Sequence, residues 1–388
     1  MFCPSWIELS ESALRQNLRF LREQLGPDVT LCSVVKGNAY GHGIENFVPL
    51  AERCGVRQFA VFSADEAERC MRCHTEDSQV MIMGPVDGEA LAWAIETGVS
   101  FFVHDLPRLA EAIATAQRVR RPALVHLELE TGLNRTGIAL EEQPQVAAMC
   151  QQASADVLVQ GVCTHFAGAE SVSNYLRIQQ QLQRFATGVE SLRGLGVDVS
   201  TRHTACSAAA FTYPESRLEL VRVGIMQYGF WPSRETEMHH LLREGLESAD
   251  RAANPLKRVM TWKSRVMGVK SVPPGEFVGY GTSYQTTRRE RIAQIPVGYY
   301  HGFARNLSNL GHVLVRGRRA PVVGAVNMNM MMIDVTDLDG VQAGDEVVLI
   351  GRQKRNQITV SSFSELTRFL NYEVLVRLPA AIPRSVVA

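Results

Sequence analysis

Apolar runs alternate with helical patterns through the first part of this chain, and this alternation restricts its fold more than any other feature. Each run has the length of a buried strand and is bounded by turn residues. Strands that alternate with helices pair in parallel, and eight such units close naturally into a (β/α)8 barrel of the TIM type. The predicted strands are residues 29–35, 58–62, 79–83, 99–103, 123–129, 158–164, 197–204 and 218–224.

The pattern changes after residue 232. A polar, charged segment at 233–254, with a helical pattern at 238–246, predicts an interdomain connection. Short β-rich runs separated by Gly and Pro then predict a second, mostly antiparallel β domain, which ends in a helix at 361–370 and a segment at 372–378. We therefore expect a barrel domain at 1–235 and a C-terminal β domain at 236–388. The runs are 259–272, 291–297, 312–315, 320–323, 330–335 and 346–350.

Composition excludes several classes of function. Forty basic residues balance forty acidic ones in a chain of 388 residues, so no overall charge attracts nucleic acid or an acidic membrane surface. No apolar stretch is long enough to span a bilayer, and residues 1–11 do not resemble a secretory signal. The eight cysteines are scattered, as expected for reduced thiols. We expect a cytoplasmic protein without a metal site.

Lys36 stands at the end of the first predicted strand, in the run Val34-Val35-Lys36-Gly37-Asn38-Ala39-Tyr40-Gly41-His42-Gly43. Parallel barrels build their active sites at the carboxyl ends of the strands. An amine at that position can form a Schiff base with a carbonyl cofactor. Many lysines beside glycines are simply solvated, so the run needs support from the rest of the chain.

Further segments supply that support, and together with the lysine run they resemble the alanine racemase family. Each is weak alone, but they follow the family's order over nearly the whole chain. The resemblance implies a pyridoxal-phosphate-dependent racemase that converts L-alanine to D-alanine by a two-base mechanism. The segments are residues 131–137, 164–167, 207–209, 222–225, 228–229, 279–281, 298–299, 328 and 371–373.

The resemblance assigns the two bases. Lys36 would hold the cofactor and then act on one face of the substrate's α-carbon. Tyr280, between Gly279 and Gly281, would act on the other face from the partner subunit of a homodimer with shared active sites. A phenol with a pKa near ~10 needs neighbouring positive charge to serve as a base. His165 and Arg222 are the candidate neighbours.

The same resemblance assigns the cofactor contacts. Arg222 would meet the ring nitrogen, and because a guanidinium keeps its proton, the ring would stay a weak electron sink. A weak sink favours racemisation over transamination. The remaining cofactor-binding residues would be His165 near the ring and, around the phosphate, Tyr40, Ser207, the amides of Gly224 and Ile225, and Tyr372.

Arg135 resembles the arginine that faces the substrate carboxylate. The backbone amide of Met328 would be the second donor to that carboxylate. Tyr299 and Tyr372 would narrow the entrance to the site.

Several positions depart from the family pattern. Many members carry a lysine modified to a carbamate where this chain has Glu128, and the negative charge is thus kept. We expect Glu128 to orient Arg135 directly or through a water molecule. Because the other departures also lie near the expected pocket, serine, or a larger or basic amino acid, stays open as substrate. They are Glu130, Cys206, His301, Asn327 and Asn329.

Two other functions compete with racemisation. A decarboxylase of the same fold type would use the same lysine, but its cysteine-bearing and glycine-rich C-terminal motifs are not evident here. A protein that carries pyridoxal phosphate without turnover is usually a lone barrel. The second predicted domain and Tyr280 favour the racemase over both.

Overall fold

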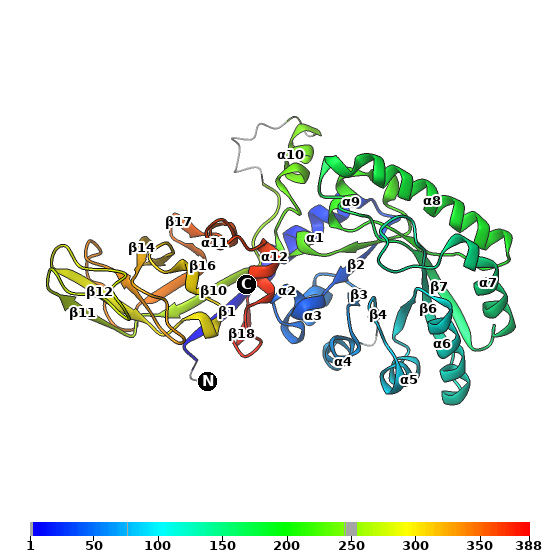
Figure 1. Ribbon diagram of the computed structural model, residues 1–388, viewed down its shortest axis with the longest axis horizontal. Helices are drawn as coiled ribbons and strands as arrows, with labels where there is room; N and C mark the ends of the chain where they lie inside the picture. Colours follow the sequence, from blue (N-terminus) through cyan, green and yellow to red (C-terminus); the bar gives the residue numbers. More distant parts are fainter. Residues whose placement is uncertain (1–2, 76, 244, 246–253) are drawn as a thin grey trace. The chain divides into compact units, whose positions relative to one another are not determined.

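Two compact units make up the chain in the computed structural model, which describes residues 3–75, 77–243, 245 and 254–388. The barrel unit comprises Ala13–Gly37 and Val48–Lys257. The sheet unit comprises Asn38–Phe47, Arg258–Ala388 and the described residues up to Ser12. Each unit therefore joins stretches that lie far apart in the sequence, as the colours in Figure 1 show.

Parallel strands form the sheet of the barrel unit, and each overlaps a predicted strand. They pair in the order β8-β7-β6-β5-β4-β3-β2-β9. The gap between β8 and β9 is bridged just beyond β8, where Arg222 N donates to Ala205 O at 3.1 Å. The sheet is thus a nearly closed barrel, and the predicted fold class is confirmed. The strands are β2 (Thr30–Val34), β3 (Gln58–Val61), β4 (Gln79–Ile82), β5 (Ser100–Val103), β6 (Ala123–Glu128), β7 (Val157–Cys163), β8 (Arg202–His203) and β9 (Leu220–Val223).

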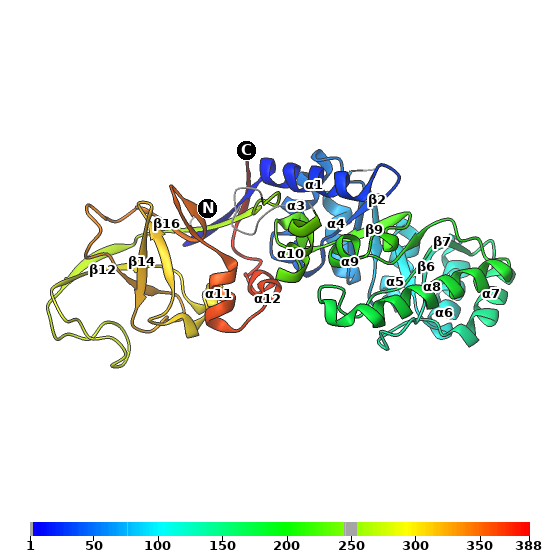
Figure 2. The same ribbon diagram turned by 90° about the horizontal axis from the view of Figure 1, so that it is seen from above.

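Helices cover the outside of these strands (Figures 1 and 2). The predicted amphipathic stretch at 106–119 is a helix with the same bounds, capped by Asp105, whose side chain accepts from the Arg108 amide at 2.8 Å. Leu109 and Ala112 on its inner face are buried against the barrel. The helices are α1 (Glu11–Leu25), α3 (Ile44–Arg53), α4 (Ala64–Cys73), α5 (Gly88–Thr97), α6 (Leu106–Val119), α7 (Gln143–Gln152), α8 (Tyr175–Gly194) and α9 (Ser207–Thr212).

The helix predicted at 238–246 is α10 (Arg234–Arg243), which begins one turn earlier. Residues 244 and 246 of the predicted helix and residues 247–253 of the connection lie outside the described residues. None of the helices in the described ranges is long and apolar enough to cross a membrane.

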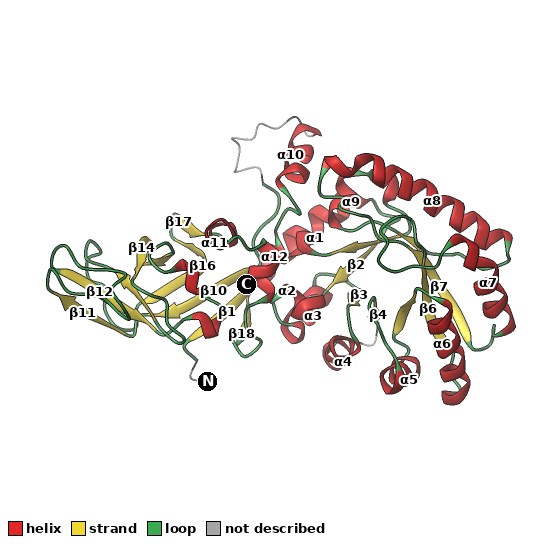
Figure 3. Ribbon diagram, viewed as in Figure 1, coloured by secondary structure: helices red, strands yellow, loops and turns green. Residues whose placement is uncertain are grey.

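Antiparallel strands dominate the sheet unit (Figure 3), as predicted. The strand order is β11-β12-β15-β14-β13-β16-β10-β1-β18, with β17 paired to β16. The sequence did not reveal β1, which pairs with β10, or β18, which pairs in parallel with β1. The strands are β1 (Ser5–Ser10), β10 (Met260–Arg265), β11 (Gly268–Val272), β12 (Glu290–Ile295), β13 (His312–Val315), β14 (Arg318–Val323), β15 (Met331–Asp334), β16 (Glu346–Gln353), β17 (Asn356–Ile358) and β18 (Arg384–Val387).

Alternation of side chains explains why β1 joins this sheet. Ile7 and Leu9 are fully buried, whereas the alternate residues Trp6, Glu8 and Ser10 are only partly covered. On the neighbouring β10, Trp262 lies opposite Ile7 and is also fully buried. The pair contributes an apolar centre to the sheet unit's core, with roughly 2–3 kcal/mol for each large side chain removed from water.

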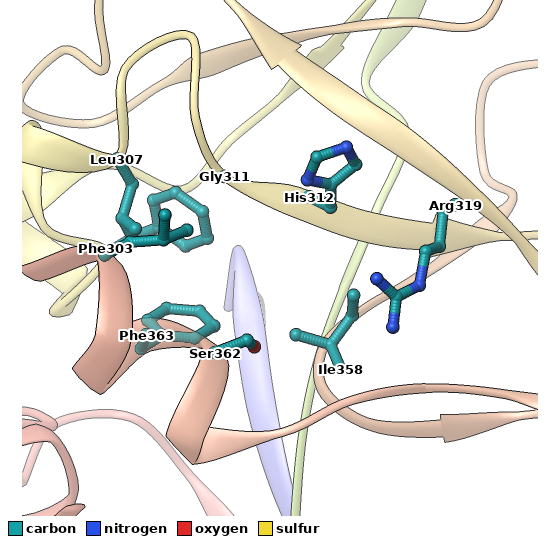
Figure 4. Close-up of a pocket in the computed structure, with 9 residues that line it drawn as sticks. Phe303, Leu307, Gly311, His312, Arg319, Ile358, Ser362 and Phe363 are labelled. Atoms are coloured by element: carbon teal, nitrogen blue, oxygen red, sulfur yellow. The ribbon is translucent and has the colours of Figure 1, made fainter.

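Two helices complete the sheet unit. The predicted 361–370 helix is α11 (Val360–Thr367), capped by the Thr359 hydroxyl, which accepts from the Ser362 amide at 3.1 Å. The segment at 372–378 corresponds to α12 (Asn371–Val376). A cavity of about 40 Å³ lies beside α11, between apolar side chains such as Phe303 and Phe363 and a polar rim (Figure 4). None of the predicted site residues lines it.

A left-handed turn follows β2. Helix α2 (Lys36–Tyr40) has positive φ angles at Gly37, Asn38, Ala39 and Tyr40, between 50° and 62°. A left-handed helix costs roughly 1–2 kcal/mol for each residue with a Cβ atom, so the surrounding structure must enforce this turn.

Contacts within the sheet unit hold the far end of that turn. Gly41 has φ of +78°, and a Cβ atom there would lie 2.0 Å from the carbonyl oxygen of Leu375 in α12. The Arg384 guanidinium donates to Gly41 O at 2.9 and 3.2 Å. Gly41 is therefore required both for its backbone angle and for its close approach to α12.

We expect Gly41→Ala to lower the free energy of unfolding by at least about 3 kcal/mol, because strain and a backbone clash add. Gly344 also has a positive φ, +90°, but a Cβ atom there meets nothing within 4 Å. Gly344→Ala should cost only about 1–2 kcal/mol, for strain alone. Urea unfolding of both variants measures the difference, and equal losses would show that the contact with Leu375 is unimportant.

Candidate active site

Most of the predicted site residues in the barrel unit lie at the carboxyl ends of its strands. Lys36 follows β2, His165 follows β7, and Ser207 opens α9 shortly after β8. Arg222 lies near the end of β9. Since all these strands are parallel, the residues gather at one end of the barrel, the end where active sites of this fold are built.

Arg222 is the most constrained of them. It is only 4% exposed, and its Nη1 donates to the ring Nδ1 and, at 2.8 Å, to the carbonyl oxygen of His203. Its Nη2 donates to Thr164 O at 2.8 Å and to Thr204 O at 3.3 Å. A guanidinium has five hydrogens, and four are thus used. No residue in the described ranges accepts the fifth, on Nε.

The charge of Arg222 has no acidic partner among the described residues, since all four acceptors are neutral. The nearby thiols do not supply a negative charge either. Burial raises the pKa of the Cys32 thiol to about 12 even though Arg222 acts in the opposite direction, and burial raises the pKa of the Cys163 thiol as well. Among the described residues, the buried Arg222 is therefore not hydrogen-bonded to any acid, and its charge favours negative charge on whatever binds beside it.

Lys36 and His165 respond to this charge. Desolvation lowers the pKa of the Lys36 amine, and Arg135 and Arg222 lower it further, while Glu66 and Cys206 oppose them. More of the amine is consequently neutral and nucleophilic at a given pH. Burial, followed by Arg222, Arg135 and Lys36, lowers the pKa of His165 to about 3, so this imidazole is neutral.

A clamp holds the strand end that carries Lys36. The carbonyl oxygen of Val34 accepts from Gln227 Nε2 and from the Tyr228 hydroxyl, both at 3.0 Å. The Ser33 hydroxyl donates to Gln227 Oε1 at 2.6 Å. Gln227 and Tyr228 lie in a short 3-10 helix, η4 (Ile225–Tyr228), directly after β9. Lys36 and Arg222 are thus linked through two adjacent strands and one turn.

Ser207 and Gly224, both predicted phosphate contacts, lie together. The Gly224 amide donates to the Ser207 hydroxyl oxygen at 2.9 Å. The Gly224 amide is therefore engaged within the chain, whereas no described residue accepts the hydroxyl hydrogen of Ser207. The amide of Ile225 begins η4, and no described residue accepts from it.

The loop after β6 carries Arg135, which is exposed. Glu128 is 4% exposed, and its Oε2 accepts from the Thr136 hydroxyl at 2.8 Å. No ion pair joins Glu128 to Arg135 among the described residues, so the direct form of the expected interaction is not seen. Glu130 accepts from the amides of Gly132 and Asn134 and so fixes the turn in this loop.

A second group of predicted residues belongs to the sheet unit. The ring of Tyr40, in the left-handed turn, lies 6.0 Å from the ring of Tyr372 in α12, measured between centroids. Tyr299 N donates to Asn327 O at 3.0 Å, which places Tyr299 beside the loop that contains Met328. These contacts form two pairs, Tyr40 with Tyr372 and Tyr299 with the Asn327–Met328 loop.

Tyr280 makes no such contact with the other predicted residues in the described part of the chain. Its side chain is 76% exposed in the single chain. Gly279 and Gly281 have φ angles of +80° and +73°, so both turns of the chain around Tyr280 depend on glycine. The phenol is thus accessible on the surface of the single chain.

The residues of the barrel unit fit pyridoxal phosphate. Its aldehyde reacts with an unprotonated amine, and the lowered pKa of Lys36 favours that form. Its phosphate needs uncharged or cationic donors such as the hydroxyl of Ser207 and the amide of Ile225. The free Nε–H of Arg222 suits a ring nitrogen that has a lone pair.

Comparisons with known proteins agree with this geometry. The family model for the N-terminal domain of alanine racemase matches residues 9–232, and the model for its C-terminal domain matches residues 259–386. The alanine racemase of Leptospira interrogans is 33% identical over 386 residues, which is 99% of this chain and 96% of that protein.

Solved structures give the same result. The alanine racemase of Streptomyces lavendulae superposes with a TM-score of 0.87 at 31% identity and covers 100% of this chain and 98% of its own. The alanine racemase of Bartonella henselae, which contains covalently bound pyridoxal phosphate, shares the fold with a TM-score of 0.82 at 24% identity over 100% of both chains. The chain therefore belongs to the alanine racemase family and is a pyridoxal-phosphate-dependent isomerase.

Proposed function

We propose that this enzyme interconverts L-alanine and D-alanine by proton transfer on both faces of the α-carbon. The observation that carries the proposal is the buried Arg222, which has no acidic partner among the described residues and lies at the same barrel end as Lys36. The names of the relatives, all alanine racemases, support alanine as the substrate.

Lys36 Nζ would hold the cofactor, and Arg222 Nε–H would face its ring nitrogen. Bound pyridoxal phosphate supplies a conjugated ring that accepts the electron pair left when the α-proton departs. Arg222 does not hand a proton to that ring, because a guanidinium stays protonated in proteins. The phosphate would be bound by Ser207 and Ile225, with Gly224, Tyr40 and Tyr372 around it and His165 beside the ring.

Two bases would share the proton transfer. The Lys36 amine, in its unprotonated form, would take the proton from one face of the α-carbon, and Tyr280 of the partner subunit would give one to the opposite face. The reverse reaction exchanges the two roles. The lowered pKa of Lys36 supports its part, and the exposure of Tyr280 supports a position outside its own chain. The net change is inversion at one carbon, with no proton gained or lost.

Arg135 would bind the substrate carboxylate, with the Met328 amide as second donor and Tyr299 near the entrance. Glu128 would act on Arg135 through Thr136, which follows Arg135 in the chain. The Thr136 hydroxyl donates a hydrogen bond to the Glu128 carboxylate. The family match over both halves of the chain argues against a lone-barrel cofactor carrier and against a decarboxylase.

We propose that the enzyme is a cytoplasmic homodimer, with a cofactor-binding domain at 1–235 and a second domain at 236–388. Shared active sites follow from the exposed Tyr280 if its phenol serves the partner. All eight cysteines are free thiols, as is usual in a reducing compartment.

Replacing Lys36 with Ala should abolish covalent attachment of pyridoxal phosphate and lower racemisation by at least about 10³-fold, because both the attachment point and one base are lost. Borohydride reduction of the wild-type enzyme, followed by peptide mass spectrometry, should place the cofactor on the Lys36 peptide. Lys270→Ala, at an exposed lysine of β11, is the matched control and should behave as wild type. Cofactor attached to a different lysine would refute the assignment.

Complementation tests the shared site. Lys36→Ala and Tyr280→Phe should each be inactive as homodimers, because each lacks one base. When the two chains are dissociated and reassociated together, half of the dimers are mixed and each holds one complete site, so about a quarter of wild-type activity should return. Chiral chromatography of the product measures it. No recovery, with mixed dimers shown by mass spectrometry, would mean that each site is built within one chain.

Changing Glu128 to Gln should raise KM for alanine about tenfold and leave kcat nearly unchanged, because the negative charge that steadies Arg135 is lost. Thr136→Val separates the charge from the hydrogen bond, since it removes the 2.8 Å contact but keeps the carboxylate. A smaller rise in KM is expected for this variant. An unchanged KM for Glu128→Gln would remove Glu128 from substrate binding.

A further inference from the structure

Two buried histidines next to Arg222 have no predicted role: His203 contacts the guanidinium, and His126 contacts His203. His203 is fully buried on β8, and His126 is 7% exposed on β6. Their rings are in contact, with His126 Nδ1 and His203 Nε2 2.9 Å apart. Phe102 from β5 packs against both rings and against the guanidinium, at 5.8 to 6.1 Å. Side chains from four barrel strands therefore form one cluster.

The hydrogen positions in this cluster follow from Arg222. Because a guanidinium can only donate, His203 Nδ1 must accept from Nη1 and carries no hydrogen. Burial and Arg222 lower the pKa of His203 well below its ordinary value, so the ring is neutral and its one hydrogen is on Nε2. That hydrogen points to His126 Nδ1, which must accept it. His126, whose pKa burial lowers to about 3, is then also an Nε2–H tautomer.

A bulge in the β6–β7 pairing and a glycine beside it make room for the His126 ring. The β6–β7 pairing is regular up to Val125 opposite Val159, and then His126 pairs with Gly161, so Gln160 is one extra residue in β7. Such bulges redirect side chains next to active sites. A Cβ atom at Gly161 would lie 2.9 Å from His126 Nδ1 and 2.8 Å from Thr201 O, so only glycine leaves room for the ring.

We propose that His126 is a positioning residue for Arg222, acting through the ring of His203, which it holds by accepting the Nε2–H. By accepting the Nε2–H of His203, His126 keeps the Nδ1 lone pair of that ring directed at Arg222. Arg222 then has its four terminal hydrogens fixed and presents Nε–H alone toward the bound cofactor. This last step rests on the proposed function, whereas the tautomers do not.

The matched variants are His126→Asn and His126→Leu. The amide oxygen of Asn occupies nearly the position of Nδ1 and keeps an acceptor, whereas Leu removes it. Nitrogen NMR of the ¹⁵N-histidine-labelled enzyme, with and without pyridoxal phosphate, reports the tautomers. We expect Nε2–H for both histidines in the wild type and wild-type His203 signals in His126→Asn. In His126→Leu the His203 Nε2 signal should shift, because its hydrogen has lost its acceptor. An Nδ1–H tautomer of His203 in the wild type would overturn the proposal.

Kinetics give the second readout. His126→Leu should lower kcat and cofactor affinity about 10- to 100-fold, the usual effect of losing a supporting hydrogen bond, with KM for alanine changed less than about threefold. His126→Asn should recover most of the loss. Equal effects of Leu and Asn would mean that His126 acts by packing alone. If the tautomers are as expected but the wild type racemises no amino acid, the proposed function fails and the histidine assignment stands.

Substitutions at two glycines test the proposal even if the His126→Leu variant does not fold. Gly161→Ala adds one methyl group against the His126 ring, whereas Gly194→Ala adds one where nothing lies within 4 Å. Gly161→Ala should shift the histidine signals and lower kcat, and Gly194→Ala should match the wild type. Wild-type signals and kcat in Gly161→Ala would overturn the proposal.

Discussion

A buried positive charge without an acidic partner organises the barrel end of this enzyme. Breaking even one hydrogen bond to a desolvated guanidinium is costly, so the acceptors around Arg222 must be in place whenever the barrel is folded. Those acceptors come from β8, from the residues after it and from Thr164 after β7. The hydrogen bonds of Arg222 therefore link the last strands of the barrel. Its charge also lowers the pKa values of Lys36 and His165.

Rigidity on one side of Lys36 contrasts with strain on the other. Before it, Val34 is held by Gln227 and Tyr228, and after it three consecutive residues with side chains adopt left-handed angles. A lysine between a clamped strand and an enforced turn has little freedom in its backbone. Its reactive amine thus starts from a fixed point, which is useful for a group that must reach one face of one carbon.

The sequence predicted the strands of the barrel well because each is an apolar run with clear boundaries, as in 29–35 and 123–129. It could not predict β1, because these alternating polar and apolar residues run directly into α1. Only the pairing with β10 identifies them as a strand. The sequence also did not predict the left-handed turn at Lys36–Tyr40, because Gly37 is the only glycine among its residues with positive φ. Residue roles followed from the family resemblance, whereas Gln227, His126 and His203 emerged from distances that no spacing rule encodes.

The pairing of β1 has a consequence for biosynthesis. Residues 5–10 are made before the barrel strands, yet both of their strand partners, β10 and β18, are made after residue 259. At roughly 5–20 residues per second, this apolar strand waits on the order of ten seconds or more for its first partner, while the barrel can already fold behind it. The edge of β1 thus stays unpaired until after the barrel strands have been made, and an unpaired apolar edge of this kind favours association with other chains.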